Sequence, residues 1–411
     1  MATAHHADGR AILVMNTFYT VLLTSTALFT GLTCSVAGAG NTVYRLADGL
    51  VYPSSFTGAK EAYLPMVAPF SHAANLLALP NGDLLCVWYT GTGERDRNVS
   101  IALSRLDRKS KRWSQPIIVA HRDNWADQNP VLFRAPNGTI LLLYDSQKHG
   151  SSEATAIVDE LISEDEGHTW TKPTILFTNP GIYLRQPIVI FHDDWLFPVY
   201  QERSGGVNSS SAGKDSSIVE VSKDSGKIWS GIDVPESGGL VQMSIVLPPR
   251  DGQLLAFFRS RYADWIYESK SVDGSHWEVP VRTSLPNNNS SIQAVRLKDG
   301  HIVMVFNNAQ AATARTHPTE GSREVLSIAL SIDNGETWPW VRDLQAGNEP
   351  PSYCLCEDPE YSYPSVTQSL NGKIQVAFTF RRETIKYMTF DEDWIKQGST
   401  VGIQRGSYNI Y

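Results

Sequence analysis

Short hydrophobic stretches alternate with turn-forming pairs along most of the chain. Apolar stretches such as residues 84–88 and 254–258 are separated by Asn-Gly or Asp-Gly pairs, which begin at Asn81, Asn137, Asp251, Asp299 and Asn371. Such a pair between two apolar stretches favours a tight turn that joins antiparallel strands. The pattern therefore predicts β-hairpins throughout, with residues 41–70 as a lead-in segment able to supply a closing strand to the last sheet.

A second repeat falls between these turns. Residues 163–170 read Ser-Glu-Asp-Glu-Gly-His-Thr-Trp, residues 222–229 and 331–338 match them closely, and residues 271–277 form a shorter copy. In each copy the Ser and Asp side chains can cap backbone donors, the Gly tolerates a positive φ, and the Trp can pack between sheets. Two hairpins in each unit of about 50–60 residues give four strands, which is one blade of a β-propeller.

Counting the turns gives six blades in an all-β fold. The interval between Gly300 and Gly372 is the longest and has room for an additional sheet, so seven blades remain an alternative. The 411 residues, 42% of them apolar, suit one large domain over residues 41–411. The net charge of −8, without a dense Lys/Arg cluster, argues against a nucleic-acid partner, because phosphate binding needs a basic face.

The N-terminal stretch predicts export. Residues 11–33 are apolar and rich in Thr, follow Arg10, and lead to small residues at 37–39. This pattern indicates a signal peptide over residues 1–39, with Met15 as an alternative start and a membrane anchor as the rival interpretation. Glycosylation sequons begin at Asn98, Asn137, Asn208, Asn288 and Asn289. We therefore expect a secreted, extracellular glycoprotein that has no membrane attachment after cleavage.

The cysteines indicate no metal site. Cys34 lies in the predicted leader, which leaves Cys86, Cys354 and Cys356. Their spacing fits neither a disulfide framework nor a zinc site, and a link between Cys354 and Cys356 stays open. We expect a monomer that needs no metal ion or cofactor.

The Ser-x-Asp-x-Gly-x-Thr-Trp repeat resembles the Asp box of sialidase-type propellers. In a propeller the first strand of each blade faces a central channel, so residues at those strand starts meet in one ligand pocket. Placed on the sialidase pattern by its turns, the chain has Arg259 and Arg323 where sialidases keep two carboxylate-binding arginines, and Tyr363 where they keep a nucleophilic tyrosine.

Two positions depart from that pattern. His72 stands in the place of the first arginine, and Gln242 stands in the place of the glutamate that activates the tyrosine. A neutral Gln cannot act as a base, whereas a His can exchange protons near neutral pH. Sialidase chemistry is therefore disfavoured, but a carboxylated sugar still suits the two remaining arginines.

Further segments resemble a narrower group of sialidase-like propellers. Residues 71–82, 127–133, 185–189 and 380–387 are similar to L-rhamnose-α-1,4-D-glucuronate lyases and related α-L-rhamnosidases, which act on arabinogalactan and gum arabic. The resemblance covers most of residues 60–400. It implies seven blades and an oligo- or polysaccharide substrate in which a uronate precedes a terminal rhamnose.

The resemblance also implies a mechanism of β-elimination. A base removes the proton at C5 of glucuronate, arginines neutralise the neighbouring carboxylate, and rhamnose leaves from O4 with a proton. His72 is the first candidate for base or acid, with Tyr363 as its partner and His121 as the second-choice histidine. Three arginines would hold the carboxylate and two amides the hydroxyls, namely Arg185, Arg259, Arg323, Gln242 and Asn129.

Each assignment has a structural alternative. His72 can be a hydrogen-bonded structural residue, Arg259 and Arg323 can form ion pairs, and Tyr363 can pack between blades. Three functional classes therefore stay open at this point: a lyase, a glycoside hydrolase of rhamnosidase or sialidase type, and a glycan-binding protein without turnover.

Overall fold

Short strands, most of them paired antiparallel, make up most of the regular secondary structure of the described residues. The computed structural model describes residues 47–151, 153–203, 212–249, 252–311, 318–347, 359–398 and 400–405, all within the unit Tyr44–Tyr411. The predicted signal peptide (1–39), Cys354, Cys356 and the sequon at Asn208 lie outside the described residues. None of the described helices is long and apolar enough to cross a membrane.

The strands of the first half form three sheets in chain order. Sheet 1 contains β3 (Phe70–Ala78), β4 (Leu84–Gly91), β5 (Ser100–Leu106) and β6 (Ile117–Ala120). Sheet 2 contains β7 (Trp125–Arg134), β8 (Ile140–Lys148), β9 (Ile157–Ser163) and β10 (Thr174–Phe177), with the short 3-10 helix η1 (Glu153–Thr155) between β8 and β9. Sheet 3 contains β11 (Ile182–Leu184), β12 (Val189–Phe191), β13 (Asp194–Gln201), β14 (Ser216–Ser222) and β15 (Ser230–Asp233), with η2 (Ala212–Lys214) before β14.

The second half continues the same pattern. Sheet 4 contains β16 (Leu240–Val246), β17 (Leu254–Ser260), β18 (Trp265–Ser271) and β19 (Val281–Pro286), and one parallel bridge joins it to sheet 3. Sheet 5 contains β20 (Gln293–Arg296), β21 (Ile302–Asn307), β23 (Val325–Ser331) and β24 (Trp340–Ala346). Sheet 6 contains β25 (Tyr361–Gln368), β26 (Ile374–Phe380) and β27 (Thr384–Phe390), completed by β2 (Lys60–Tyr63) and β1 (Tyr52–Pro53).

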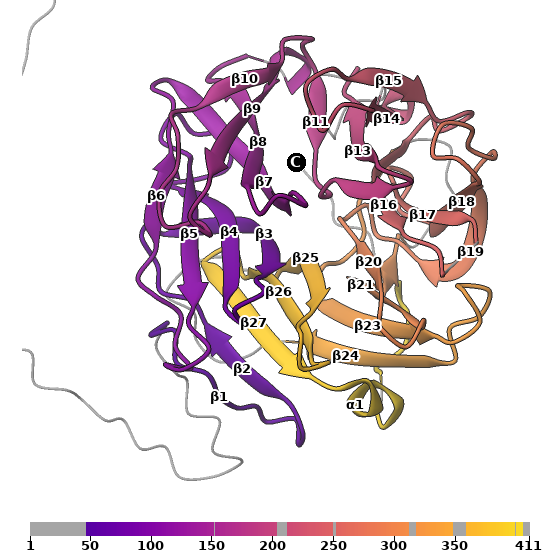
Figure 1. The fold of residues 1–411 in the computed structure, drawn as a ribbon. Helices are drawn as coiled ribbons and strands as arrows, with labels where there is room; N and C mark the ends of the chain where they lie inside the picture. Colours follow the sequence, from indigo (N-terminus) through magenta and orange to yellow (C-terminus); the bar gives the residue numbers. More distant parts are fainter. Residues whose placement is uncertain are drawn as a thin grey trace, which may run out of the picture. The chain divides into compact units, whose positions relative to one another are not determined.

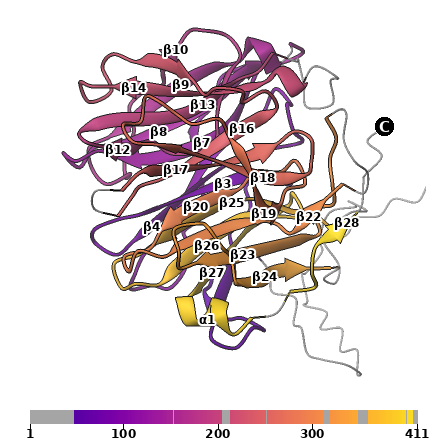
Figure 2. The ribbon, with the colours of Figure 1, turned by 90° about the vertical axis from the view of Figure 1, so that its right-hand side faces the viewer.

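Three small elements lie outside these sheets. Helix α1 (Glu392–Lys396) follows β27, and β22 (Ala309–Gln310) pairs in parallel with β28 (Gln404–Arg405). Figure 2 shows the β22–β28 pair to one side of the sheets.

The six sheets surround a common centre. Figure 1 shows β3, β7, β11, β16, β20 and β25 at the inner end of each sheet, with the later strands further out. Six hydrophobic clusters each join one sheet to the next, and the last joins sheet 6 to sheet 1. Burial of each large apolar side chain contributes about 1.5–3 kcal/mol, so a sheet gains its stability from two neighbours. The predicted all-β propeller is confirmed.

The N-terminal lead-in closes this ring. Strand β2 pairs with β27 in an antiparallel register in which Lys60 faces Thr389 and Tyr63 faces Lys386. The prediction that this segment supplies a closing strand to the last sheet is therefore confirmed. Among the described residues, the long interval between Gly300 and Gly372 holds β21, β23 and β24 of sheet 5, the short strand β22, and β25 of sheet 6.

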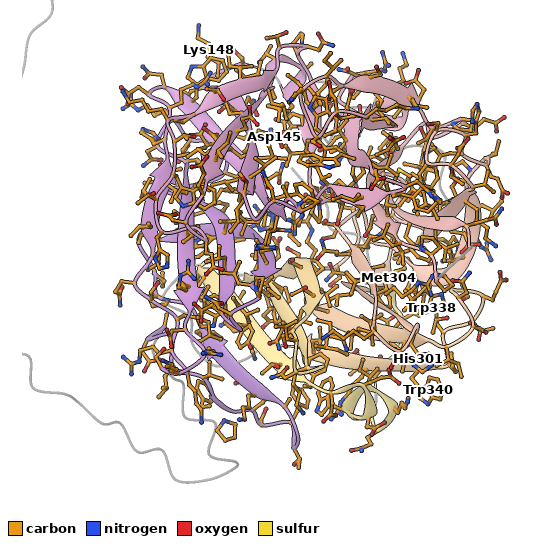
Figure 3. The ribbon with its side chains drawn as sticks, viewed as in Figure 1. Asp145, Lys148, His301, Met304, Trp338 and Trp340 are labelled. Atoms are coloured by element: carbon orange, nitrogen blue, oxygen red, sulfur yellow. The ribbon has the colours of Figure 1, made fainter. Side chains whose placement is uncertain are left out.

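The second sequence repeat forms the outer turns as predicted. Ser163 Oγ accepts from Gly167 N at 2.8 Å and donates to Asp165 Oδ1 at 2.8 Å. The same carboxylate accepts from the backbone N of Thr169 at 2.8 Å, and Gly167 has φ +85°. The tryptophans pack against the preceding sheet; for example, Trp338 of sheet 5, labelled in Figure 3, makes an edge contact with Phe257 of sheet 4 at 5.8 Å.

Candidate active site

A β-bulge recurs in four of the inner strands. Strands β3, β7, β16 and β25 each contain a bulge, where the register shifts by an extra residue. The bulges contain Ala73, Asn129, Gln242 and Tyr363, all with φ between 47° and 59°. A positive φ costs about 1–2 kcal/mol for a residue other than Gly, and bulges near active sites redirect side chains. Three of these four residues are predicted site residues.

A cavity of about 440 Å³ lies where these bulges meet. Its walls are polar and contain five arginines, three glutamates, four tyrosines and three amides. They are Arg95, Arg259, Arg261, Arg323, Arg382, Glu94, Glu153, Glu320, Tyr89, Tyr183, Tyr200, Tyr363, Gln128, Asn129 and Gln242. Such a wall suits a ligand rich in hydroxyl and carboxylate groups.

Arg259 joins two of the bulge residues. Its Nη1 donates to Tyr363 Oη at 2.7 Å and to Gln242 Oε1 at 3.1 Å, and its Nε donates to Asn289 Oδ1 at 2.8 Å. Its Nη2 is buried and has no hydrogen-bond partner among the described residues. All three acceptors are neutral, so the charge of this guanidinium is uncompensated.

The charge of Arg259 affects the pKa of the Tyr363 hydroxyl. Burial acts to raise the pKa of Tyr363, but Arg259 and Arg323 outweigh burial, and the pKa lies below its ordinary value. A hydroxyl with a lowered pKa loses its proton more readily, which suits a group that transfers protons.

The other four lining arginines are ion-paired. Arg95 pairs with Glu153, and Arg261 pairs with Glu202 at 3.1 Å and Asp215 at 3.0 Å. Arg323 pairs with Glu360 at 2.8 Å, and Arg382 pairs with Glu360 and Glu94, both at 2.5 Å. Burial acts to raise the pKa of Glu94, but Arg382 outweighs it and lowers the pKa to about 2. Among the described lining arginines, Arg259 is thus the one with a free charge.

His72 lies beneath the cavity wall and is not among the lining residues. Its ring is buried 4.3 Å from the Tyr363 ring, and its Nδ1 shares a hydrogen bond with Thr379 Oγ1 at 2.8 Å. Burial and Arg382 hold the pKa of His72 well below its ordinary value, so the ring is neutral at pH 7. The residue directly precedes the bulge of β3, where Ala73 takes the left-handed position. A role for His72 in proton transfer stays a prediction.

Arg185 is also buried below the cavity and does not line it. Its Nη2 donates to three carbonyl oxygens, those of Ala74, Tyr363 and Pro364, at 2.9–3.0 Å. Its Nε donates to Ser291 Oγ at 3.1 Å. The guanidinium therefore ties the inner strand of sheet 1 to that of sheet 6, and it supports the bulge that carries Tyr363.

The remaining two predicted residues differ in position. Asn129 lines the cavity, and its Nδ2 donates to the buried carboxylate of Asp145, labelled in Figure 3, at 3.0 Å. His121 lies outside the cavity lining; its Nδ1 is 3.0 Å from Ser100 Oγ, and its Nε2 is 3.6 Å from Asp123. The structure thus brings together Arg259, Arg323, Tyr363, Gln242 and Asn129, and it does not bring His121 to them.

Sequence reasoning missed several lining residues. Arg382 lies in the segment 380–387 and Arg261 lies two residues after Arg259, but no motif in the sequence gives either of them a role. Glu94 comes from the loop between β4 and β5, and Glu153 comes from the short helix η1; no repeat marks either position. Only their convergence in the folded chain reveals them.

One group of side chains elsewhere has the composition of a metal site. Among the described residues, Asp299, His301 and Glu392 place ligand atoms within 4.8 Å of one another. Glu392 also pairs with Lys396 at 2.5 Å, and this ammonium competes for the same carboxylate. The expectation that the protein needs no metal or cofactor stays a prediction.

Comparison with solved structures supports the fold. The intramolecular trans-sialidase from Ruminococcus gnavus, in complex with oseltamivir carboxylate, has a TM-score of 0.63 and 14% identity over 86% of this chain and 100% of that chain. The leech intramolecular trans-sialidase has a TM-score of 0.62 and 13% identity over 80% and 69%. NanB sialidase from Streptococcus pneumoniae has a TM-score of 0.59 and 14% identity over 85% and 71%.

These TM-scores establish a sialidase-like β-propeller fold, whereas the low sequence identities leave the reaction open. No sequence among the curated proteins is significantly similar to the chain. The narrower resemblance to rhamnose-glucuronate lyases therefore stays a prediction. The model of the BNR repeat-like domain matches residues 82–376, so the chain belongs to the family of BNR repeat-like domain proteins.

Proposed function

We propose that the protein is a secreted polysaccharide lyase that removes terminal L-rhamnose from α-1,4-linked D-glucuronate by β-elimination. The coarser statement, a sialidase-like protein that processes or binds glycans, follows from the family and the fold. The observation that carries the finer proposal is the Arg259–Tyr363 pair, in which an uncompensated guanidinium meets a tyrosine hydroxyl with a lowered pKa.

The free charge of Arg259 supports a carboxylate ligand. Its buried Nη2 has no partner among the described residues, so an incoming carboxylate oxygen would satisfy both the charge and the hydrogen-bond donor. Charge-assisted hydrogen bonds of this kind are shorter and stronger than neutral ones. In a uronate the same contact stabilises the negative charge that develops when the C5 proton leaves.

Tyr363 is the lining group best suited to move that proton. Its hydroxyl is 2.7 Å from Arg259 Nη1, so a carboxylate bound to Arg259 would lie beside it. Loss of the tyrosine proton produces a phenolate, which can accept the C5 proton and pass it to the leaving O4. In this scheme His72 lies beneath the cavity wall and packs against the Tyr363 ring, so it influences proton transfer through Tyr363.

The same site disfavours the glycosidase alternative. A tyrosine nucleophile needs a neighbouring base, and the residue that shares Arg259 with Tyr363 is the neutral Gln242. A glycosidase that works through two carboxylates needs one acid and one base or nucleophile on either side of the bond. Each of the three lining carboxylates is paired with an arginine: Glu94 with Arg382, Glu153 with Arg95 and Glu320 with Arg323.

The product distinguishes the three functions. The secreted protein is incubated with gum arabic, and released rhamnose is followed together with the absorbance of a 4,5-unsaturated uronate. We expect one unsaturated end for each rhamnose released. Rhamnose without the unsaturated product would identify a hydrolase, and binding without release would identify a glycan-binding protein; either result contradicts the proposal.

A further inference from the structure

Two arginines of the cavity differ sharply in their surroundings, although they stand two residues apart. Arg259 lies in β17 and Arg261 follows that strand, and both line the cavity. The acceptors of Arg259 are a phenol and two amides. Arg261 instead lies against two buried carboxylates, those of Glu202 and Asp215, at 3.1 Å and 3.0 Å.

The carboxylates behind Arg261 change what it can bind. One positive charge faces two negative charges, so this part of the wall does not attract a carboxylate of the ligand. The Nη1 of Arg261 is nevertheless buried without a partner among the described residues. A donor of this kind needs an acceptor, and a neutral hydroxyl oxygen supplies one without adding charge.

Aromatic rings extend the same part of the wall. The guanidinium of Arg261 lies over the Tyr200 ring at 5.6 Å, and Tyr200 stacks on Tyr183 at 5.7 Å. Both tyrosines line the cavity. Tyrosine rings combine an apolar face with a polar edge, so they suit a sugar that has both a hydrophobic face and hydroxyl groups.

We propose that the cavity has two subsites of different charge, an Arg259 subsite for the carboxylate of an acidic sugar and an Arg261 subsite for a neutral deoxy sugar. The Cα atoms of residues two apart in the chain lie at most about 7 Å from each other, which is the scale of adjacent rings in a disaccharide. The inference deepens the proposed function and rests on it for the identity of the two sugars, glucuronate and rhamnose.

The test measures the binding of each half of the substrate separately. Glucuronate and methyl α-L-rhamnoside are titrated by NMR against the wild-type protein, Arg261→Lys and Arg259→Lys. Lysine keeps the positive charge beside Glu202 and Asp215 but removes the forked guanidinium. We expect Arg261→Lys to weaken the rhamnoside about 10- to 100-fold, as for a lost hydrogen bond to a charged donor, and to change glucuronate binding little. Arg259→Lys should instead weaken glucuronate binding and change rhamnoside binding little.

A competition experiment needs no variant and stands even if Arg261→Lys fails to fold. Saturating glucuronate should leave rhamnoside binding to the wild-type protein intact, because the two occupy separate subsites. Mutual displacement, absence of rhamnoside binding, or a loss of glucuronate affinity alone in Arg261→Lys would overturn the inference.

Turnover of gum arabic in the same preparations separates this inference from the proposed function. Formation of the unsaturated product without the two binding preferences overturns only the subsites. The two binding preferences without that product support the subsites and contradict the proposed reaction.

Discussion

The outer turns and the central cavity show opposite uses of the same repeating strands. In the outer turns, each Ser and Asp of the repeat meets a backbone donor, and positive φ falls on the glycine and, in the three long copies, on the residue directly before it. At the centre, positive φ falls on Asn129, Gln242 and Tyr363, and the guanidiniums of Arg259 and Arg261 keep unpartnered donors among the described residues. The turns are thus built for stability, whereas the centre is built to bind a ligand.

The contrast between the outer turns and the cavity predicts the largest loss of activity for a substitution of Arg259. Arg259→Ala should lower kcat/KM on a glucuronate substrate by about 2–5 kcal/mol, the cost of losing a desolvated charge pair with the ligand. This corresponds to a loss of roughly 30- to 5,000-fold. Steady-state kinetics, with circular dichroism as a check on folding, would measure it.

The matched control is Arg282→Ala in the same sheet. Arg282 is exposed and stacks over Trp265 at 4.2 Å, away from the cavity lining. Its variant should keep wild-type activity. If the folded Arg259 variant is active to within a few fold, Arg259 does not belong to the site.

An outer turn should show the opposite response. Ser163→Ala leaves the backbone N–H of Gly167 without its acceptor, which should lower the free energy of unfolding by about 1–3 kcal/mol. Activity per folded molecule should stay unchanged. Denaturant unfolding and kinetics would measure the two quantities on one preparation.

Ser275→Ala is the control for this turn prediction. Ser275 lies in the shorter copy of the repeat, where its backbone N, not its hydroxyl, donates to Asp273. The change in stability should stay within about 0.5 kcal/mol. A Ser163 variant as stable as this control would show that the repeat's Ser does not stabilise the turn.

The smallest effect concerns His72 and pH. Its pKa is lowered in the folded state, so below pH 6.5 the unfolded chain binds a proton that the folded chain excludes. The stability that depends on a neutral His72 is therefore complete above pH 6.5 and falls as the pH approaches the lower folded pKa. Between pH 6.5 and 5.5 the wild type should lose up to about 1 kcal/mol more than His72→Gln. Equal losses in the two proteins would contradict the buried neutral ring.

The repeats made the fold predictable from the sequence. Each Asn-Gly pair and each Ser-x-Asp-x-Gly turn is a local signal, because its hydrogen bonds lie within a few residues. The closing strand was also predictable, since the lead-in precedes the first repeat and pairs with β27.

The site was predictable only in part. The resemblance predicted five site residues that do line the cavity, namely Arg259, Arg323, Tyr363, Gln242 and Asn129. The bulges decide which side chain of an inner strand faces the cavity, and no local signal in the sequence marks them. For this reason His72, which directly precedes the bulge of β3, lies beneath the wall.

The most direct test compares Tyr363→Phe with the wild type on the disaccharide α-L-rhamnosyl-(1→4)-D-glucuronate, recording the absorbance of the unsaturated uronate together with released rhamnose. The substitution keeps the ring that packs on His72 and removes only the hydroxyl that Arg259 contacts. Loss of a positioned proton-transfer group should slow both signals about 100- to 10,000-fold in a normally folded protein. Unsaturated product formed at the wild-type rate by Tyr363→Phe, or rhamnose released by the wild type without unsaturated product, would contradict the account.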